Sequence, residues 1–466
     1  MSIRKVGLNL VLFLLTILLF SLTFNVYGIS HIEGTQNNNA KSYSTKDLSK
    51  LGILSEASIV LTHIEFKTLT IKVGSSPAYA IYDPKNNYIY VLNSRSNTVS
   101  VIANTSVIAN ISVEPNPVLG VYDPTNGYIY VVDNSSFSVS VISNTTVITT
   151  ISLGTPPTSA LSPPFYNHIY ITDAIYDPAN GYIYLVDYSG ENIIVISDTS
   201  VIANIPIGFN PISATYDPAN TDVFVADFCN PTFNIPSNQV SIISGTSIIG
   251  SIKVEVEPYS VTYDPSNGYL YITNYLAGTI SVVSSTPTPY TINAGGLLTT
   301  ATYNPSNGYV YFMDPGDNTV VVVSGTSIIT SIKAFAPKCG VYDQANGYVY
   351  VLGDGVVYII NNTQLLYTIT VGENPVSAVY DPINGYVYVV NEDSNSVSVI
   401  YSVTYLPSSS TVSTSSAPII SSSTTSSVSS SNNYFIFLVL IVVIASVFAV
   451  VGGILTIKRG VRSLLL

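Results

Sequence analysis

A segment of twelve residues that begins at Tyr122 and reads YDPTNGYIYVVD recurs along most of the chain at intervals of about 40 residues. Similar segments begin at Tyr82, Tyr176, Tyr216, Tyr263, Tyr303, Tyr342 and Tyr380. Self-similarity at a fixed period determines architecture, because each repeat must bury its apolar faces against its neighbours. The chain is therefore an array of eight similar units, and this constrains its fold more than any single residue does.

Each repeat contains the chemistry of a tight chain reversal between two strands. In the segment 123–127 the aspartate can hydrogen-bond the backbone of its own turn, the proline presets φ, and Asn-Gly supplies positive φ. The strand after the turn is apolar on both faces, which predicts a strand covered on both sides. Two segments in which apolar and polar residues alternate come next, at 96–102 and 106–113 in the clearest repeat. Each unit therefore contains four short strands.

Four short strands in a period of about 40 residues are typical of a propeller blade, so the sequence predicts an all-β fold, an eight-bladed β-propeller. Successive units begin at Pro77, Pro117, Pro157, Pro211, Pro258, Leu297, Pro337 and Pro375. The third unit contains two hairpins that align with each other, 161–174 and 175–188, which we interpret as one extra hairpin within a blade. The fourth unit is lengthened at 228–238, where we expect a loop insertion.

The eighth unit has three clear strands up to Ile400 and only a weak candidate for a fourth, at 402–406. A better candidate lies at the other end of the chain, because 71–73 precedes the fourth strand of the first unit, 111–113, by 40 residues. A ring closes most firmly when its last blade combines strands from both ends of the chain, since this removes exposed edges. We therefore expect 66–74 to pair with the strand at 396–400.

The segment before the repeats indicates export. Residues 1–28 combine a basic start, an apolar run and a small residue at the end, as in a secretory signal peptide. An uncleaved membrane anchor is the alternative, because the apolar run almost reaches spanning length. A polar leader at 29–57 follows, and the propeller is predicted to span 58–406.

The segment after the repeats indicates a membrane anchor. Residues 407–433 are almost entirely Ser and Thr, which predicts a stalk. Residues 434–457 carry no charge and are long enough for a transmembrane helix, and the basic segment 458–466 predicts a cytoplasmic tail. The sequence thus predicts a cell-membrane protein whose propeller is extracellular and whose C-terminus is cytoplasmic.

The composition excludes several classes of function. Charged residues are only 9% of the chain, and only 15 residues are Lys or Arg, whereas nucleic-acid binding requires clustered cations. We therefore expect no nucleic-acid partner. Two cysteines and three histidines argue against a disulfide scaffold, a four-thiolate zinc site and a histidine-rich metal centre, so we predict no metal and no cofactor. With 36 tyrosines and many Ser, Thr and Asn residues, the surface should be neutral and rich in hydroxyls.

The repeat unit resembles the YVTN-repeat β-propeller family, which is named for the end of its second strand. The matching segments, in order of likeness, are YITN at 271–274, YVLN at 90–93 and YVVN at 388–391. The resemblance covers about 66–400 and implies a propeller of the kind found in archaeal and bacterial surface-layer or cell-surface proteins. Members of that family more often have seven blades, so seven is the alternative to eight. The resemblance carries over no catalytic residue.

A set of acidic residues is placed where second strands end: Asp133, Asp173, Asp187, Asp227 and Asp314. We expect these acids on one face of the disc, near the channel mouth where propellers usually bind ligands. They could contact a ligand there, but solvated loop residues are the preferred interpretation. The aspartate of each Tyr-Asp-Pro turn could also be read as a calcium ligand. A hard cation needs six or more converging oxygens, so turn formation explains these aspartates better.

Nucleophilic catalysis requires a base beside the nucleophile. His168 is the only histidine in the repeats, and it occupies a turn position that holds Gly elsewhere, so we predict no catalytic residue. The two cysteines are a sharper candidate, because Cys229 in the inserted segment and Cys339 in a link should lie on the same face. An extracellular protein can form this disulfide. Two separate buried thiols are the preferred alternative.

Five Asn-x-Ser/Thr sequons are candidate N-glycosylation sites, which would make the protein a glycoprotein: Asn104, Asn110, Asn134, Asn144 and Asn361. Together these features predict a membrane-anchored module for recognition, adhesion or envelope structure, with glycans or surface proteins as partners. The less favoured alternative is an extracellular propeller enzyme, a lyase, lactonase or hydrolase with its site at the channel mouth. A channel lined with Ser, Thr and Asn would favour binding, whereas clustered His, Glu, Arg or metal would favour catalysis.

Overall fold

The structure is a computed structural model that describes residues 63–155, 171–230, 235–284 and 288–405. The chain divides into two compact units, 1–407 and 408–466, and all described residues belong to the first. The described strands form eight antiparallel sheets of four strands each. The predicted signal peptide, leader, stalk, membrane helix and tail, and His168, lie outside the described residues. In the part of the chain that is described, no helix has the length and hydropathy of a membrane span.

The strands occupy four positions in each blade, from the channel to the rim. The innermost strands are β2 (Pro77–Asp83), β6 (Pro117–Asp123), β10 (Ile171–Asp177), β14 (Asn210–Asp217), β18 (Pro258–Asp264), β22 (Ala301–Asn304), β26 (Gly340–Tyr342) and β30 (Pro375–Asp381). The second strands are β3 (Tyr88–Asn93), β7 (Tyr128–Asp133), β11 (Tyr182–Asp187), β15 (Asp222–Asn230), β19 (Tyr269–Asn274), β23 (Tyr309–Asp314), β27 (Val349–Leu352) and β31 (Tyr386–Asn391).

The third strands are β4 (Thr98–Ala103), β8 (Ser138–Ser143), β12 (Asn192–Ser197), β16 (Ile235–Ser244), β20 (Thr279–Val283), β24 (Thr319–Ser324), β28 (Val356–Asn361) and β32 (Ser396–Tyr405). The outermost strands are β5 (Ser106–Ser112), β9 (Thr146–Ser152), β13 (Ser200–Pro206), β17 (Ser247–Lys253), β21 (Tyr290–Asn293), β25 (Ser327–Lys333), β29 (Gln364–Thr370) and β1 (His63–Lys72). Blades 1 to 7 each take four consecutive strands from β2 to β29. Blade 8 consists of β30, β31, β32 and β1.

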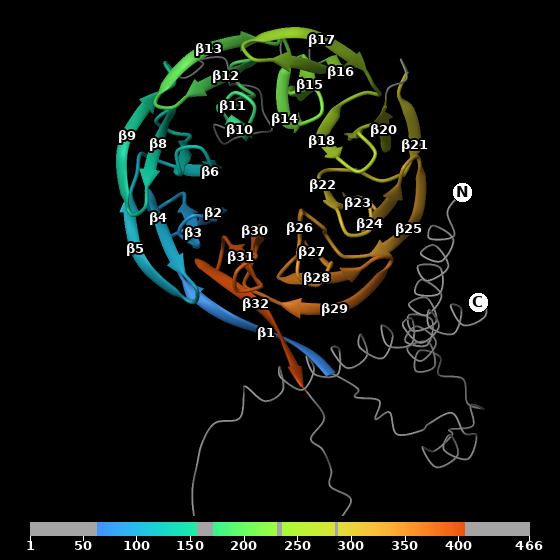
Figure 1. Ribbon diagram of the computed structural model, residues 1–466. Coiled ribbons are helices and arrows are strands. Elements are labelled where there is room, and N and C mark those ends of the chain that lie inside the picture. The colour runs from blue at the N-terminus through green and yellow to red at the C-terminus, as the bar shows by residue number, and fades with distance from the viewer. Residues whose placement is uncertain (1–62, 156–170, 231–234, 285–287, 406–466) are drawn as a thin grey trace, which may run out of the picture. The chain divides into compact units, whose positions relative to one another are not determined.

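The eight sheets form a closed ring around a channel (Figure 1). The innermost strand of each blade contacts the innermost strand of the next, and β30 of blade 8 contacts β2 of blade 1. The predicted eight-bladed propeller of four-stranded blades is therefore confirmed, and the alternative of seven blades is wrong.

The turn between the first two strands has the chemistry that its sequence predicts. In blade 2 the Asp123 carboxylate accepts a hydrogen bond from the Thr125 N–H at 2.8 Å, and the Gly127 N–H donates to the Asp123 carbonyl at 2.8 Å. Gly127 has a φ of 76°, a backbone conformation that glycine adopts without steric cost. In this turn Asp123 is thus a turn residue, as predicted, and the corresponding aspartates of the other blades make equivalent bonds.

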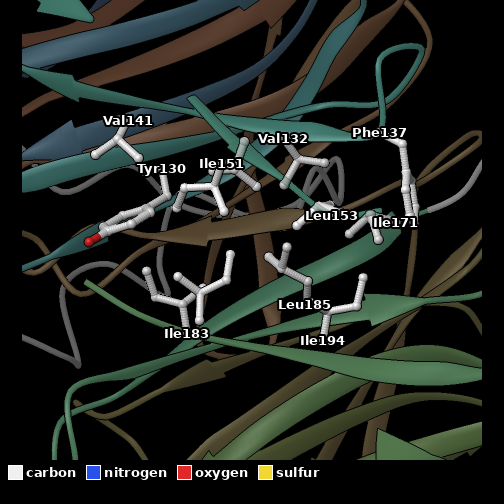
Figure 2. Close-up of a cluster of buried hydrophobic side chains, with 12 residues drawn as sticks. Tyr130, Val132, Phe137, Val141, Ile151, Leu153, Ile171, Ile183, Leu185 and Ile194 are labelled. Atoms are coloured by element: carbon white, nitrogen blue, oxygen red, sulfur yellow. The ribbon is translucent and has the colours of Figure 1, made fainter. Parts of the chain in front are cut away.

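The middle strands are buried on both faces, because neighbouring blades cover them. Tyr130 and Val131 of β7 are 0% exposed although they point to opposite faces of the sheet. Figure 2 shows the apolar cluster that fills the space between blades 2 and 3, in which Tyr130 and Val132 of one blade meet Ile183 and Leu185 of the next. The outermost strands instead alternate between exposed and covered residues, so burial decreases toward the rim.

A buried tyrosine in the second strand joins most blades to the next. The Tyr130 hydroxyl accepts a hydrogen bond from Asn126 at 3.0 Å and donates one to the Asp198 carbonyl, in blade 3, at 2.8 Å. Corresponding tyrosines donate to carbonyls of the following blade: Tyr90 to Asn144, Tyr184 to Gly245, Tyr311 to Asn362 and Tyr388 to Asn104. A buried hydroxyl with both partners present avoids the desolvation penalty of an unpaired polar group.

A second set of tyrosines joins the blades at their innermost strands. The Tyr122 hydroxyl of blade 2 hydrogen-bonds the turn carboxylate of Asp83 in blade 1. The same contact recurs in the pairs Tyr82–Asp381, Tyr176–Asp123, Tyr216–Asp177, Tyr263–Asp217, Tyr303–Asp264 and Tyr380–Asp343. Asn304 replaces the aspartate in blade 6 and donates instead to the Gly347 carbonyl of blade 7 at 2.9 Å. In the repeated Tyr-Asp-Pro motif the aspartate therefore stabilises its own turn, and the tyrosine contacts the turn aspartate of the preceding blade.

Strands from the two ends of the described chain close the ring. Strand β1 pairs antiparallel with β32 over ten residue pairs, from His63 opposite Tyr405 to Lys72 opposite Ser396. The predicted pairing of 66–74 with 396–400 is confirmed. The proposed weak fourth strand at 402–406 is wrong, because its described residues continue β32 and pair with the first half of β1.

Two other irregular segments differ from expectation. Residues 171–174, which end the first of the two aligned hairpins, belong to the innermost strand β10, and the described sheet of blade 3 has four strands. The remainder of that first hairpin falls mostly outside the described residues. The insertion in blade 4 is not the expected loop, since β15 and β16 extend into it as a longer hairpin in which Cys229 pairs with Pro236.

The closure generates a prediction about β1. Ile71 is 7% exposed and packs in the core of blade 8, whereas Leu69 on the same strand is 41% exposed. Replacing Ile71 with Asp places a carboxylate in this core, so Ile71→Asp should lower the free energy of unfolding by about 3 kcal/mol or more. Leu69→Asp should lower it by less than about 1 kcal/mol. Urea unfolding of both variants checks this, and equal stability of the two would contradict the role of β1.

Candidate functional site

Connections between strands alternate between the two faces of the ring, because neighbouring strands run antiparallel. We call one side the link face; it carries the loops between second and third strands, such as 275–278, and the links between blades, such as 254–257. We call the other the turn face; it carries the Asp-Pro turns and the turns before the outermost strands. Because His63 of β1 lies opposite Tyr405 of β32, the described chain enters and leaves the ring on the turn face (Figure 1).

The innermost strands are irregular at their link-face ends. In blade 1 the pairing of β2 with β3 shifts register between Pro77 and Tyr79, a β-bulge that re-aims the following side chain. The same shift occurs in blades 2, 3, 4, 5 and 8. The residues at this position, four before the turn aspartate or asparagine, are named the inner ring: Tyr79, Leu119, Asp173, Ser213, Ser260, Thr300, Cys339 and Ser377.

Tyr79 extends into the channel. Its side chain is 38% exposed although it belongs to an innermost strand. Burial, with a smaller contribution from the charges of Asp173 and Cys339, raises the pKa of Tyr79 to about 12. These two residues belong to blades 3 and 7, on opposite sides of the ring, so a hydroxyl that is close to both lies near the channel axis.

Asp173 is the one predicted acid that lies on the inner ring. We expected Asp173 to end a second strand. It lies instead in the innermost strand β10. Its carboxylate accepts hydrogen bonds from the Ala174 N–H at 2.8 Å and from the Ala214 N–H of blade 4 at 3.0 Å. Burial raises the pKa of Asp173, and these bonds lower it in part.

Of the other four predicted acids, Asp133, Asp187 and Asp314 end second strands as expected, whereas Asp227 lies within β15, which continues to Asn230. They are not solvated loop residues, since none is more than 1% exposed. The Asp133 carboxylate accepts hydrogen bonds from the Ser140 N–H at 3.0 Å and its hydroxyl at 2.6 Å, and Asp227 accepts one from Ser241 at 2.8 Å. Asp133 and Asp227 therefore fix the third strand of their own blades, whereas Asp314 accepts hydrogen bonds from the Leu297 N–H of a link and the Asp317 N–H of a loop, both at 3.0 Å.

Asparagine performs the same role in other blades. The side-chain amides of Asn93, Asn274 and Asn391 each donate to a serine hydroxyl of the third strand at 3.0 Å. Whether the residue is aspartate or asparagine, one buried Oδ1 has no protein hydrogen-bond partner, as in Asp133, Asp227, Asn93, Asn274 and Asn391, and only the aspartates can carry a charge there. Burial accordingly raises the pKa of Asp133 to about 8 and that of Asp227 to about 7.

An aromatic group that the sequence analysis did not single out lies on the link face. Phe228 and Tyr259 have ring centroids 6.0 Å apart in an edge-to-face arrangement, and Tyr259 stacks on Tyr275 with centroids 5.6 Å apart. Tyr259 comes directly after Pro258. The residue after the equivalent proline is alanine or valine in blades 1, 2 and 8, so this difference from the repeat could have identified Tyr259 as a candidate site residue. We call these three residues the aromatic row.

Lys338 comes directly before Cys339, the inner-ring residue of blade 7. Its ammonium donates a hydrogen bond to the Asn374 amide oxygen, and the Asn374 amide nitrogen donates to the Glu392 carboxylate at 3.1 Å. Burial raises the pKa of the neighbouring Cys339 thiol to about 11, although Lys338 lowers it slightly. A thiol in this environment stays protonated at neutral pH and is a poor nucleophile.

The two cysteines do not form the candidate disulfide in this structure. Cys229 donates to the Asn210 amide oxygen at 3.3 Å, and Cys339 donates to the Val376 carbonyl at 3.7 Å, so each thiol has its own partner. They belong to blades 4 and 7, which lie far apart around the ring. Within the described ranges, no group of three or more His, Cys, Asp or Glu side chains is placed to hold a metal ion.

The sequons differ in accessibility. Asn104, Asn110 and Asn144 are exposed, and Asn361 is half-buried. Asn134 is 3% exposed, and its amide oxygen accepts a hydrogen bond from the Ile171 N–H at 3.2 Å. A glycan on Asn134 is therefore incompatible with the folded ring.

Comparison with models of known protein families gives no match, and no curated protein matches the chain. Solved structures similar to this chain include Kuenenia stuttgartiensis hydrazine synthase, with a TM-score of 0.48 and 15% identity over 71% of this chain and 96% of that one. A catalytically inactive virginiamycin B lyase from Staphylococcus aureus with quinupristin has a TM-score of 0.48 and 14% identity over 72% and 99%. A streptogramin B lyase has a TM-score of 0.48 and 12% identity over 74% and 100%. Likeness at this level supports no functional argument.

The buried aspartates generate a prediction about pH. Because folding raises their pKa, Asp133 and Asp227 stabilise the protein most below the pKa of the unfolded chain, and this stability is lost as pH rises toward about 8 and about 7. Asp133→Asn and Asp227→Asn should each raise the free energy of unfolding by about 1–3 kcal/mol at pH 8.5. The gain should be small at pH 4.5, where the native carboxyls are protonated.

Urea unfolding at both pH values measures this difference. Asp198→Asn is the matched control, because Asp198 is exposed in a turn where Asn104 and Asn144 occupy the corresponding positions. It should change stability equally at both pH values. A gain for Asp133→Asn that does not depend on pH would contradict the assignment of a raised pKa to this carboxyl.

Proposed function

We propose that this protein is a cell-surface recognition module, a propeller of the YVTN-repeat type that is exported, anchored by its C-terminal segment and bound to its ligand through the link face. The observation that carries this proposal is the distribution of exposed apolar side chains over that face. Val256, Leu276, Leu297 and Phe335 are 38%, 60%, 39% and 62% exposed. They lie on loops and links of consecutive blades, from blade 5 to blade 7.

The opposite half of the link face is polar. Its exposed residues in blades 8, 1 and 2 and their links include Ser75, Arg95, Glu114, Ser135, Glu373 and Asp393. Single exposed apolar residues are ordinary on protein surfaces, but a group of them on one side of one face is typical of a contact surface. Exposed acids, Glu255, Asp317 and Asp354, also lie on the loops and links of blades 5 to 7, so the two halves differ in their exposed apolar side chains and not in the presence of charge.

The position of the chain ends supports a surface-displayed module. Both ends of the described chain emerge on the turn face, through β1 and β32. The loops of the link face are therefore clear of both ends of the described chain and are open to a ligand. Under this proposal Asn104, Asn110 and Asn144, which are exposed, are the sequons available for glycans.

The chemistry of the inner ring favours binding over catalysis. Burial raises the pKa values of Tyr79 to about 12 and of Cys339 to about 11, and it also raises that of Asp173. A phenol and a thiol that remain protonated supply neither a general base nor an activated nucleophile. Ser260 and Ser377 of the inner ring are buried, whereas Tyr79 is 38% exposed and offers a neutral hydroxyl that suits an uncharged ligand.

The proposal is tested by changing one face at a time. Leu276→Lys combined with Phe335→Lys places two charges on the apolar half of the link face and should weaken ligand capture at least tenfold, on the order of 1.4 kcal/mol. Ile383→Lys is the matched control, because Ile383 is 69% exposed on the turn face and Lys85 occupies the same turn position in blade 1.

The measurement is binding of the full-length protein to a glycan array and to surface proteins from the same cells. We expect Ile383→Lys to bind as the parent does. Equal binding by the link-face variant, or loss of binding only in Ile383→Lys, would contradict the proposal.

A further inference from the structure

The aromatic row crosses the junction between blades 4 and 5 on the link face. Phe228 belongs to the lengthened strand β15, Tyr259 to the innermost strand β18, and Tyr275 to the loop after β19. All three side chains are half-buried, so each keeps accessible surface. The three rings come from separate elements, and Tyr259 lies between the other two, with Phe228 against it edge-on and Tyr275 stacked on it.

Backbone hydrogen bonds hold the row in place. The Tyr275 N–H donates to the Glu257 carbonyl at 2.8 Å, and the Glu257 N–H donates to the Ser237 carbonyl of blade 4 at 2.8 Å. Glu257 has a φ of 56°, which is unusual for a residue other than glycine, and these two bonds fix it there. Because the loops are fixed before a ligand arrives, binding incurs little cost in conformational entropy.

The polar groups beside the row are acceptors and neutral donors. Burial raises the pKa of the Glu257 carboxyl, which is half-buried next to the link. The Tyr188 hydroxyl contacts the Cys229 thiol and is electrostatically coupled to Glu257. None of these neighbours is a cation, and the whole chain has a net charge of −12, so an anionic ligand is disfavoured at this place.

An aromatic surface edged by hydrogen-bonding groups suits a ligand with one apolar face and several hydroxyls. A pyranose ring has this character, since its C–H groups form a flat apolar face and its hydroxyls point outward. A nucleobase would also stack, but the attached phosphates would meet Glu257 and no compensating cation. An apolar peptide would leave the hydroxyl and carboxyl groups beside the row without partners.

We propose that the aromatic row binds a neutral saccharide, with a pyranose ring packed on the side of Tyr275 that faces away from Tyr259 and sugar hydroxyls bonded to Glu257 and Tyr188. This inference rests on the proposed function of the link face and names its ligand class. The insertion in blade 4 contributes Phe228 to this site, which gives the lengthened hairpin a role that a spacer between strands would not have.

The test uses the full-length protein and exploits the absence of tryptophan from the chain. In Tyr275→Trp the new indole is the only tryptophan and lies in the row. The probes are neutral oligosaccharides of glucose, mannose, galactose and N-acetylglucosamine, with oligosaccharides of uronic acids as charged counterparts. We expect a neutral saccharide to shift or quench the emission of Tyr275→Trp in a saturable manner and the charged counterparts to have no effect.

Tyr290 provides the matched control, because it is 55% exposed on the outermost strand β21 of the same blade. Tyr290→Trp should not respond to the saccharide, and Tyr290→Ala should bind it with unchanged affinity. Tyr275→Ala should bind at least tenfold more weakly, while its thermal unfolding stays close to that of the parent.

Four results decide the matter. A saturable response confined to Tyr275→Trp, with loss of affinity in Tyr275→Ala, supports the inference. Saccharide binding that is equal in Tyr275→Ala and Tyr290→Ala overturns the aromatic row as the site. Binding of a protein alone, weakened by the Leu276→Lys and Phe335→Lys changes, overturns the saccharide and leaves the link-face function standing. Binding that no link-face change alters overturns both proposals.

Discussion

The antiparallel pairing of β1 with β32 is the interaction on which the remaining structure depends. Without it, blade 8 would lack its outermost strand and the ring would have an open edge. The pairing also has a visible local effect. The outermost strand of blade 8 comes from the other end of the chain, so no turn joins it to β32, and the second-strand tyrosine of blade 7, Tyr350, has no turn carbonyl to reach. Its hydroxyl contacts the Asp343 carboxylate at 3.3 Å instead.

The junctions between neighbouring blades are built from the same kinds of contact around the ring. Most blades contribute a buried second-strand tyrosine, as Tyr130 does toward Asp198, and an innermost tyrosine, as Tyr122 does toward Asp83. Phe224 replaces the buried tyrosine in blade 4, and Tyr350 of blade 7 bonds within its own blade, so the ring tolerates two junctions without this hydroxyl contact. A rigid frame of this kind leaves the loops of the link face free to vary, and the aromatic row and the apolar residues of blades 5 to 7 lie on those loops.

Much of the fold could be predicted from the sequence, because turn chemistry and strand alternation are local and are repeated eight times. The closing strand at 66–74 was also predictable, since its register with 111–113 is preserved in the spacing. Burial of Asp133 and Asp227 was not predictable in this way. It depends on which side of a strand a neighbouring blade covers, and a repeat does not show that. The same holds for Asp173, whose place on the inner ring follows from the strand β10 and not from its local sequence.

The candidate site could be predicted only where a residue departs from its repeat. Tyr79 stands where Ser213, Ser260 and Ser377 stand in other blades, and Tyr259 stands where small aliphatic residues are usual. Such substitutions are visible in an alignment of the repeats with one another. Their meeting on one face is not visible there, because Phe228, Tyr259 and Tyr275 come from different elements that are brought together by the packing of blade 4 against blade 5.

The most direct test of this account is a disulfide engineered between the two closing strands, in a protein whose native Cys229 and Cys339 are replaced by Ser. Glu65 and Val403 lie directly opposite each other in the β1–β32 ladder, so Glu65→Cys with Val403→Cys should oxidise to a bridge that peptide mapping detects. Glu65→Cys with Thr404→Cys is shifted by one residue, which turns the second thiol to the other side of the sheet, and should remain reduced. A bridge in the first pair alone is the predicted result; no bridge, or equal bridging in both pairs, would contradict a ring closed by its two ends.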